Sequence, residues 1–210
     1  EQIFLDGNEL AKGSEYFRFG DVAISPDHAM AAWTFDDKGS EFYELRVRDM
    51  ATAKDHDDVL RNTSGDATWA ADGKSFFYTL QDENHRPLKT FHHVLGTPQS
   101  ADRLVYEETD TGKFTGVGLT HSERFIVISS HDHDTSEAWI IDAAKPLDAP
   151  KLIAAREAGI EYDLEHWKDA FIIKTNRDGA EDYKIMTTPV DKPSPENWMD
   201  LIAYREGCFL

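Results

Sequence analysis

One local pattern, found twice near the start of the chain, limits the possible fold more than any other feature. Residues 66–80 read DATWAADGKSFFYTL: an apolar run, a turn at Asp72-Gly73, and a run of aromatic and β-branched residues. Residues 21–35 read DVAISPDHAMAAWTF and repeat this order around Pro26 and Asp27. Because glycine takes a positive φ without steric cost, the Asp-Gly pair predicts a tight turn between two strands. Asp27 and Asp72 are 45 residues apart, which is the spacing of blades in a β-propeller.

Strand-like runs continue along the whole chain in four groups of four. The clearest is Tyr43–Asp49, where apolar and charged residues alternate, as in a strand with one solvated face. No stretch of a dozen residues has a convincing helical period, so we predict an all-β fold of about four four-stranded antiparallel blades. The expected strands are 21–25, 30–35, 43–49 and 59–60; 67–70, 75–80, 88–95 and 103–106; 115–120, 125–129, 138–142 and 151–154; and 161–166, 171–175, 183–188 and 200–202.

The whole chain, 1–210, is expected to form one partial propeller domain. We divide it into a lead-in over residues 1–20 and blade-like repeats over 21–65, 66–112, 113–158 and 159–210. In the lead-in we expect a short strand at Gln2–Leu5 and a helical turn over Glu9–Lys12, capped by Asp6 and Asn8. Neither end supplies a strand that would complete the blade at the other end. We therefore expect an incomplete arc whose open ends self-associate.

Net charge restricts the possible partners. The chain has 40 acidic and 22 basic residues, a formal net charge of −18. Nucleic acids and anionic membranes both require a basic face, so neither is an expected partner, whereas cationic partners are compatible with this charge. Acidity that only keeps the protein soluble remains an equally simple explanation. With a single cysteine, Cys208, no apolar run of about 20 residues and no signal-peptide pattern at the start, we expect a cytoplasmic location.

Motifs with catalytic or metal-binding chemistry are weak throughout. The strained turn of a serine hydrolase reads G-x-S-x-G, and the nearest string, Asn62-Thr63-Ser64-Gly65, lacks the first glycine and is expected to connect two blades. The run His131–Asp134 has metal-ligand chemistry, but it is expected to be a solvated hairpin. His92 and His93 are adjacent on a strand, so they face opposite ways and cannot chelate one ion. We predict no catalytic residues, no cofactor-binding residues, no metal ligands and no cofactor.

Three further groups of residues are interpreted structurally. Adjacent carboxylates are expected to be a wet surface, because neighbours in a loop are not held across a substrate. Tryptophans in successive repeats are expected to pack one blade on the next. Glycines in the first strand of the third repeat are expected to relieve crowding beside the central channel. The carboxylate pairs are Asp36-Asp37, Asp57-Asp58, Glu107-Glu108 and Glu181-Asp182; the tryptophans are Trp33, Trp69, Trp139 and Trp167; the glycines are Gly116 and Gly118.

Several phrases of the sequence together resemble a known family. They are Trp69-Ala70 with the Asp72 turn, Phe76-Phe77-Tyr78, the segment His92–Pro98, Leu104–Glu108, Thr135-Ser136-Glu137, and Glu161-Tyr162 before His166. These residues resemble the propeller of the prolyl oligopeptidase family, and within it the oligopeptidase B (protease II) branch. The resemblance runs over essentially the whole chain.

The resemblance implies a role for this chain within a larger enzyme. Family members combine a seven-bladed propeller with an α/β-hydrolase domain that carries a Ser-Asp-His triad, and the propeller limits access to the buried site. Oligopeptidase B cleaves short peptides after Arg or Lys. The resemblance therefore implies a non-catalytic propeller portion, inactive alone, whose partners are short basic peptides and the catalytic domain of the same parent chain.

Two other functions remain open from the residues alone. One is a free-standing propeller that binds protein partners and has no enzymatic activity. The other is a sugar- or metal-dependent propeller enzyme, which would need carboxylates from several blades to converge in the channel.

Overall fold

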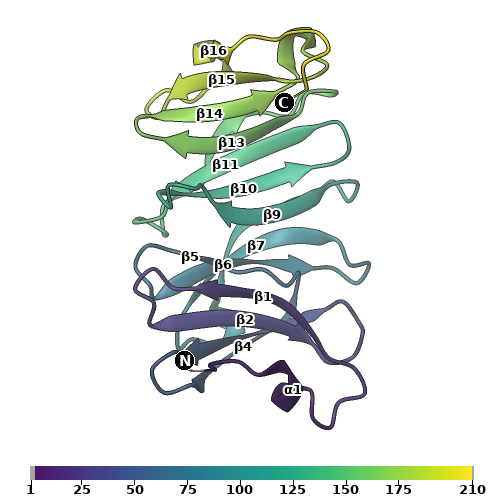
Figure 1. The fold of residues 1–210 in the computed structure, drawn as a ribbon, viewed down its shortest axis with the longest axis vertical. Helices are drawn as coiled ribbons and strands as arrows, with labels where there is room; N and C mark the ends of the chain where they lie inside the picture. Colours follow the sequence, from purple (N-terminus) through teal and green to yellow (C-terminus); the bar gives the residue numbers. More distant parts are fainter. Residues whose placement is uncertain (1–2, 210) are drawn as a thin grey trace.

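A computed structural model describes residues 3–209 and contains sixteen strands in four consecutive groups (Figure 1). Every strand predicted for the four blade-like repeats is present. The first group is β1 (Arg18–Ile24), β2 (Met30–Asp36), β3 (Tyr43–Asp49) and β4 (Lys54–Thr63); the second is β5 (Thr68–Trp69), β6 (Ser75–Gln81), β7 (Pro87–Val94) and β8 (Arg103–Glu107). The third is β9 (Phe114–Leu119), β10 (Phe125–His131), β11 (Ser136–Asp142) and β12 (Lys151–Ala154); the fourth is β13 (Tyr162–Trp167), β14 (Ala170–Thr175), β15 (Lys184–Pro189) and β16 (Met199–Ile202).

Within each group the strands pair antiparallel in chain order. The third and fourth groups are separate four-stranded sheets, with strand orders β12-β11-β10-β9 and β13-β14-β15-β16. The first two groups are joined into one sheet because Thr63 of β4 pairs with Leu80 of β6. Figure 1 shows the four groups one above another, with their strands running across the view. This arrangement confirms the all-β fold and the partial β-propeller.

The lead-in differs from its prediction. Gln2 lies outside the described residues, and Ile3, Phe4 and Leu5 form no strand. The helical turn is α1 (Gly7–Leu10), which begins two residues earlier than expected because Asp6 is its N-cap: the Asp6 carboxylate accepts from the backbone N–H groups of Asn8 and Glu9. Three short 3₁₀ turns complete the elements: η1 (Gln99–Ala101), η2 (Arg177–Gly179) and η3 (Pro195–Asn197).

The two repeated turns are held by their aspartates. The Asp72 carboxylate accepts from the backbone N–H of Lys74 at 2.8 Å and of Ser75 at 3.0 Å, and Gly73 has a φ of 61°. In the earlier turn, the Asp27 carboxylate accepts from the backbone N–H of Ala29 at 3.0 Å. Such side-chain acceptors replace the backbone bonds that a tight turn leaves unmade. The tight turns predicted from the repeat are therefore confirmed.

Three apolar clusters pack the four groups against one another. The first joins Leu45 and Leu60 to Trp69 and Phe76; the second joins Phe77 to Ile126 and Ile141. The third joins Phe125 and Ile153 to Phe171, Ile173 and Trp198. Because residues on a strand alternate between its faces, Phe76 and Phe77 belong to different clusters. Each sheet is thus buried on the faces that meet a neighbour.

The loops gather at two ends of the groups because neighbouring strands run in opposite directions. We call one end the connection face; it holds the links between groups, residues 64–67, 108–113 and 155–161, and the hairpin loops 37–42, 82–86 and 132–135. The chain enters the first strand of each group, and leaves the last strand, at this face. Contacts across the connection face include the ring of Phe42 on that of His85 and the guanidinium of Arg86 over Phe114.

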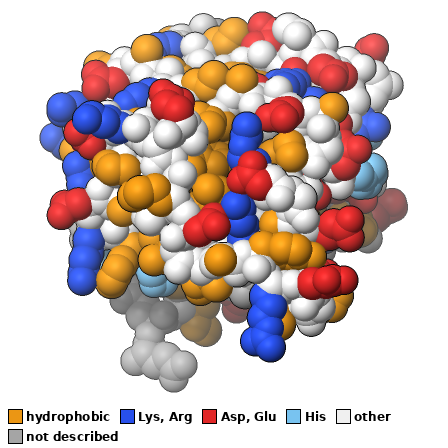
Figure 2. Space-filling view, turned by 90° about the horizontal axis from the view of Figure 1, so that it is seen from above, with side chains coloured by type: hydrophobic (Ala, Val, Ile, Leu, Met, Phe, Trp, Pro, Cys, Tyr) orange, Lys and Arg blue, Asp and Glu red, His pale blue; other side chains and the backbone are white. Residues whose placement is uncertain are grey.

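One face of the last sheet remains apolar and exposed. Its shallow hollow is lined by Trp167, Ala170, Thr187, Pro189 and Met199, and we call it the outward face. Trp167 and Met199 are each 61% exposed. Figure 2 looks down onto the fourth group and shows hydrophobic side chains running across it. No helix within residues 3–209 is long and apolar enough to cross a membrane.

Candidate functional site

The first strands of successive groups lie side by side and form an inner wall. The indole N–H of Trp69 in β5 donates to the carbonyl of Ala23 in β1 at 2.9 Å. On the other side of β5, the Thr68 hydroxyl donates to the carbonyl of Val117 in β9 at 3.1 Å. These side-chain bonds fix β1, β5 and β9 as neighbours. In a propeller, such first strands line the central channel.

A groove of about 360 Å³ lies along this inner wall, between β9 and β13. Its lining is mainly apolar or small: Gly116, Val117, Gly118, Leu119, Val127, Ser129, Ala138, Tyr162 and Leu164, together with the carboxylates Asp66 and Asp163. A Cβ at Gly118 would meet nothing within 4 Å, and one at Gly116 would make only ordinary contact with the Ser129 hydroxyl. The expectation that these glycines relieve crowding is therefore wrong. They keep a groove open.

The two carboxylates in the groove come from the groups on either side of β9. Asp66 lies in the link between β4 and β5 and accepts a hydrogen bond from the hydroxyl of Ser64, while Asp163 is an exposed residue of β13. Burial raises the pKa of the Asp66 carboxyl, the Ser64 hydroxyl partly opposes this, and the nearby charge of Asp21 adds to the increase. A positive charge in the groove would therefore stabilise the ionised form of Asp66.

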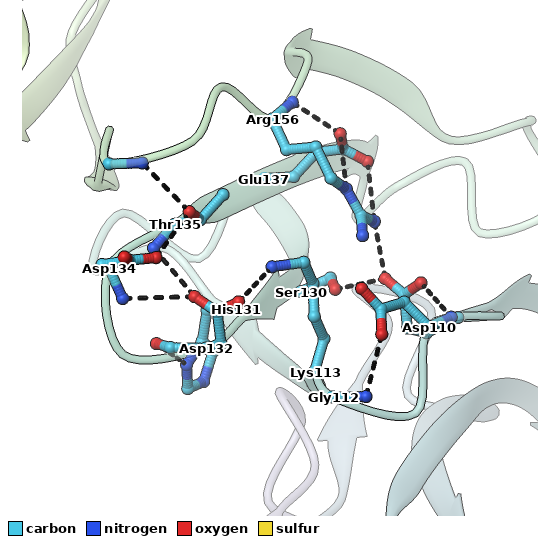
Figure 3. A network of polar contacts seen from close by, with 12 residues as sticks. Asp110, Gly112, Lys113, Ser130, His131, Asp132, Asp134, Thr135, Glu137 and Arg156 are labelled. Carbon is cyan, nitrogen blue, oxygen red and sulfur yellow. Dashed lines mark hydrogen bonds and ion pairs between the residues drawn. The ribbon is translucent and has the colours of Figure 1, made fainter.

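A network of ion pairs and hydrogen bonds lies on the connection face (Figure 3). The Arg156 guanidinium bonds Glu108 at 2.6 Å and Glu137 at 3.2 Å, and so joins the end of the second group to the third. Burial by itself would raise the pKa of Glu108, but hydrogen bonds from Arg156 and Ser130 outweigh it and lower the pKa to about 2. Both carboxylates of this network are therefore paired with the same cation.

The run His131–Asp134 is the hairpin that the sequence predicts. The Asp132 carboxylate accepts from the Lys113 ammonium and from the backbone N–H groups of Asp134 and Thr135 (Figure 3). Both histidines are exposed. Within residues 3–209 no group of three His, Cys, Asp or Glu side chains is arranged to hold a metal ion. Ser64 lies in the connecting segment between β4 and β5, as expected.

The prediction that adjacent carboxylates form a wet surface is wrong for three of the four pairs. Asp36, Asp58 and Glu108 are each no more than 4% exposed. Each belongs to a strand or follows one directly, so its neighbour faces solvent while it faces inward. The Asp36 carboxylate, for example, accepts from the backbone N–H of Lys38 at 2.9 Å and of Glu41 at 2.7 Å and so closes the loop after β2.

The packing of one group on the next is confirmed for two of the four tryptophans. Trp69 packs with Leu45 of the first group, and Trp139 packs on Tyr106 of the second. Trp33 is buried, but its ring packs on Phe19 and Phe35 of its own group. Trp167 lies on the outward face and is 61% exposed.

His92 and His93 face opposite ways, as predicted. The ring of His92 packs on Phe77 and that of His93 on Phe76. His93 is fully buried, and its two ring nitrogens are each 2.8 Å from a carboxylate oxygen, of Asp58 and Asp102. The sequence reasoning missed this bridge between the first two groups. The signal available was the alternation on β4 and β7, which points Asp58 and His93 toward the same junction.

Comparison with known proteins places the chain. The sequence-family model for the prolyl oligopeptidase N-terminal β-propeller domain matches residues 1–210. Dipeptidyl aminopeptidase BI of Pseudoxanthomonas mexicana is 36% identical over 211 residues, which is 100% of this chain and 29% of that protein. Protease 2 of Moraxella lacunata is 31% identical over 212 residues, or 100% of this chain and 30% of that protein. The chain therefore spans less than a third of the length of these relatives.

Solved structures agree with this match. Oligopeptidase B from Leishmania major superposes with a TM-score of 0.91 at 27% identity, over 97% of this chain and 29% of that one. Oligopeptidase B from Trypanosoma brucei, solved with covalently bound antipain, gives 0.87 at 31% identity, over 98% of this chain and 29% of that one. With the strand groups and the inner wall described above, these matches show that the chain belongs to the prolyl oligopeptidase family, as part of its N-terminal β-propeller domain.

Proposed function

We propose that this chain is the substrate-gating, non-catalytic propeller portion of an oligopeptidase B-like serine peptidase that cleaves short peptides after Arg or Lys. The observation that carries the proposal is the family match over residues 1–210, joined to the high TM-scores against two oligopeptidase B structures. The acidic groove on the inner wall supports a basic peptide as substrate. The same match favours this function over a free-standing interaction module and over a sugar- or metal-dependent propeller enzyme.

The topology supports a position for the catalytic domain. A chain that enters a propeller at a first strand and leaves it at a last strand does both at the connection face. We therefore place the α/β-hydrolase domain of the parent chain against this face, where the Arg156 network holds neighbouring groups together. A substrate must then pass the inner wall or the space between the two domains, and a folded protein is too wide for either route.

The division of the chain follows from the same proposal. Residues 21–65, 66–112, 113–158 and 159–210 each serve as one blade, after a lead-in of residues 1–20. A cytoplasmic location is part of the proposal and rests on the sequence alone.

The experiment uses the full-length protein that contains this chain. We expect it to hydrolyse an arginyl amide whose amino terminus is blocked, to be inactivated by a serine-directed reagent, and to leave the same sequence uncut inside a folded protein. The isolated 210-residue chain should hydrolyse nothing. Hydrolysis by the isolated chain, or indifference of the full-length enzyme to the folded context, would contradict a gating role.

A second activity is favoured by one observation: the relative at 36% identity is named a dipeptidyl aminopeptidase. Such an enzyme requires a free amino terminus, whereas an endopeptidase does not. The same assay distinguishes them when blocked and unblocked dipeptidyl amides are compared. Turnover of the unblocked substrate alone would assign the aminopeptidase activity to the parent enzyme and retain the propeller's gating role.

A further inference from the structure

The groove between β9 and β13 can accept an extended chain. Its floor is β9, which is the inner edge strand of its sheet, so one edge of β9 has no neighbouring strand of the same sheet. Gly118 leaves open space above the backbone, and Val117, Leu119 and Leu164 supply apolar walls. An edge strand without shielding side chains can pair with the backbone of an extended peptide, and the walls then contact its side chains.

The charge of the groove selects a cation. Asp66 and Asp163 take part in no ion pair among residues 3–209. Lys174 is the cross-strand neighbour of Asp163, but its ammonium lies 4.6 Å from the centre of the Tyr183 ring. Asp66 is half-buried and has no cation, which is unfavourable. A basic side chain entering the groove therefore gains attraction from Asp66 and from the exposed Asp163.

We infer that this groove is a binding site for a lysine or arginine side chain of an extended peptide, at a position remote from the bond that is cleaved. The inference rests on the proposed function and adds a binding site within the propeller itself. Under this inference the propeller does more than exclude large proteins: it selects among small peptides by a charge several residues away from the cleaved bond.

The test compares two blocked peptides with the full-length protein. Both have one arginine at the cleavage site, and one has lysine where the other has norleucine, six residues away. We expect a lower KM for the lysine peptide. Asp66→Asn and Asp163→Asn should each raise the KM of the lysine peptide by about threefold to tenfold and leave that of the norleucine peptide unchanged, where tenfold is about 1.4 kcal/mol. High salt should also reduce the preference for the lysine peptide, because it screens the attraction between the lysine and the two acids.

Matched variants separate charge from shape. Asp57→Asn removes the same charge from an exposed residue of β4 and should change neither KM. Asp66→Glu keeps the charge and should keep the preference. Gly118→Val fills the groove and should raise the KM of both peptides.

Two failures can be distinguished. Binding of both peptides is also measured by fluorescence anisotropy, so that the groove is tested even if the enzyme cleaves neither. If the short arginyl amide is not hydrolysed, the proposed function fails while the binding data still report on the groove. If the amide is cleaved but Asp66→Asn affects both peptides equally, or neither, the groove inference is wrong and the proposed function stands.

Discussion

His93 illustrates how one residue can join two blades. Both of its ring nitrogens are 2.8 Å from carboxylate oxygens, and the Asp102 carboxylate also receives the Tyr78 hydroxyl at 2.9 Å. A neutral imidazole has only one N–H, so it cannot donate to both acids, whereas an imidazolium can. Burial disfavours the charged ring, but the hydrogen bonds and charges of Asp102 and Asp58 outweigh burial and raise the pKa of His93.

This geometry predicts a stability that decreases at alkaline pH. Since the pKa of His93 is higher in the folded chain than in the unfolded one, its contribution is complete below the unfolded value, about 6.5, and is lost as pH rises through the folded value. Urea unfolding at a series of pH values measures this decrease. Asp58→Asn should reduce it, since one acid is removed, and His93→Phe should cost about 3–5 kcal/mol by leaving two buried acids unpaired.

Two other histidines lie near this junction. The ring of His56 is 3.9 Å from the Asp58 carboxylate, and His92 is the neighbour of His93 on β7. Following the ring resonances of His93 by NMR shows whether His93 loses its proton in the pH range where stability decreases. Asp57→Asn should leave the pH dependence unchanged. An alkaline decrease that persists in Asp58→Asn would show that His93 is not its source.

The hydrogen-bond partners of a side chain are harder to predict from the sequence than the face of the strand on which it lies. The rule that adjacent residues on a strand point to opposite faces gave the correct answer for His92 and His93. The same rule, applied to Asp57-Asp58 or Glu107-Glu108, would have placed one acid of each pair inside. In a chain of net charge −18, however, most acidic residues lie on the surface, so the composition masks the few that are buried.

Among the elements, strands with an alternating pattern were predicted closely and polar ones were not. Tyr43–Asp49 and Lys151–Ala154 have the same bounds in sequence and structure. β4 was expected only at Val59-Leu60 but runs from Lys54 to Thr63. Its polar first half has low intrinsic strand preference and pairs with β3 through backbone bonds. Pairing with a neighbour, which no single-sequence pattern reports, determines its length.

The link between the second and third groups predicts an acid-sensitive junction. The pKa of Glu108 falls from an ordinary 4.5 to about 2, so its stabilising effect is present above 4.5 and is lost as pH falls toward 2. That shift corresponds to a contribution of Glu108 to the free energy of unfolding on the order of 3 kcal/mol. Glu108→Gln should flatten the acid limb of stability between these pH values, measured by urea unfolding.

Removing the cation tests the same junction from its other side. Arg156→Met should destabilise the chain by about 2–4 kcal/mol, because the buried Glu108 then lacks its cation; the partial exposure of Arg156 keeps the effect moderate. Arg177→Met removes an ion pair with the exposed Glu157 and should cost under about 1 kcal/mol. Equal losses for the two variants would contradict a special role for the Arg156 network.

At the scale of the whole molecule, the 45-residue repeat was sufficient to predict four packed groups. Three clusters follow from four groups, because each group buries one face against each neighbour. The groove was not predictable, since it depends on how far β9 and β13 stand apart. Glycines at 116 and 118 are compatible with either a crowded or an open site, and only the packed structure distinguishes the two.

The outward face leads to the last prediction, which concerns association. Trp167 and Met199 are large, apolar and mostly exposed, and contiguous apolar surface of this kind favours contact with another apolar surface. We expect the isolated chain to self-associate through this face, giving a mass by light scattering that rises with concentration. Trp167→Glu with Met199→Glu should shift the chain toward the monomer, because each contact would then bury unpaired charge. Leu147→Glu alters an equally exposed apolar residue outside this face and should leave the mass unchanged. A constant monomer mass for the unaltered chain, or an equal response to Leu147→Glu, would show that the outward face does not drive association.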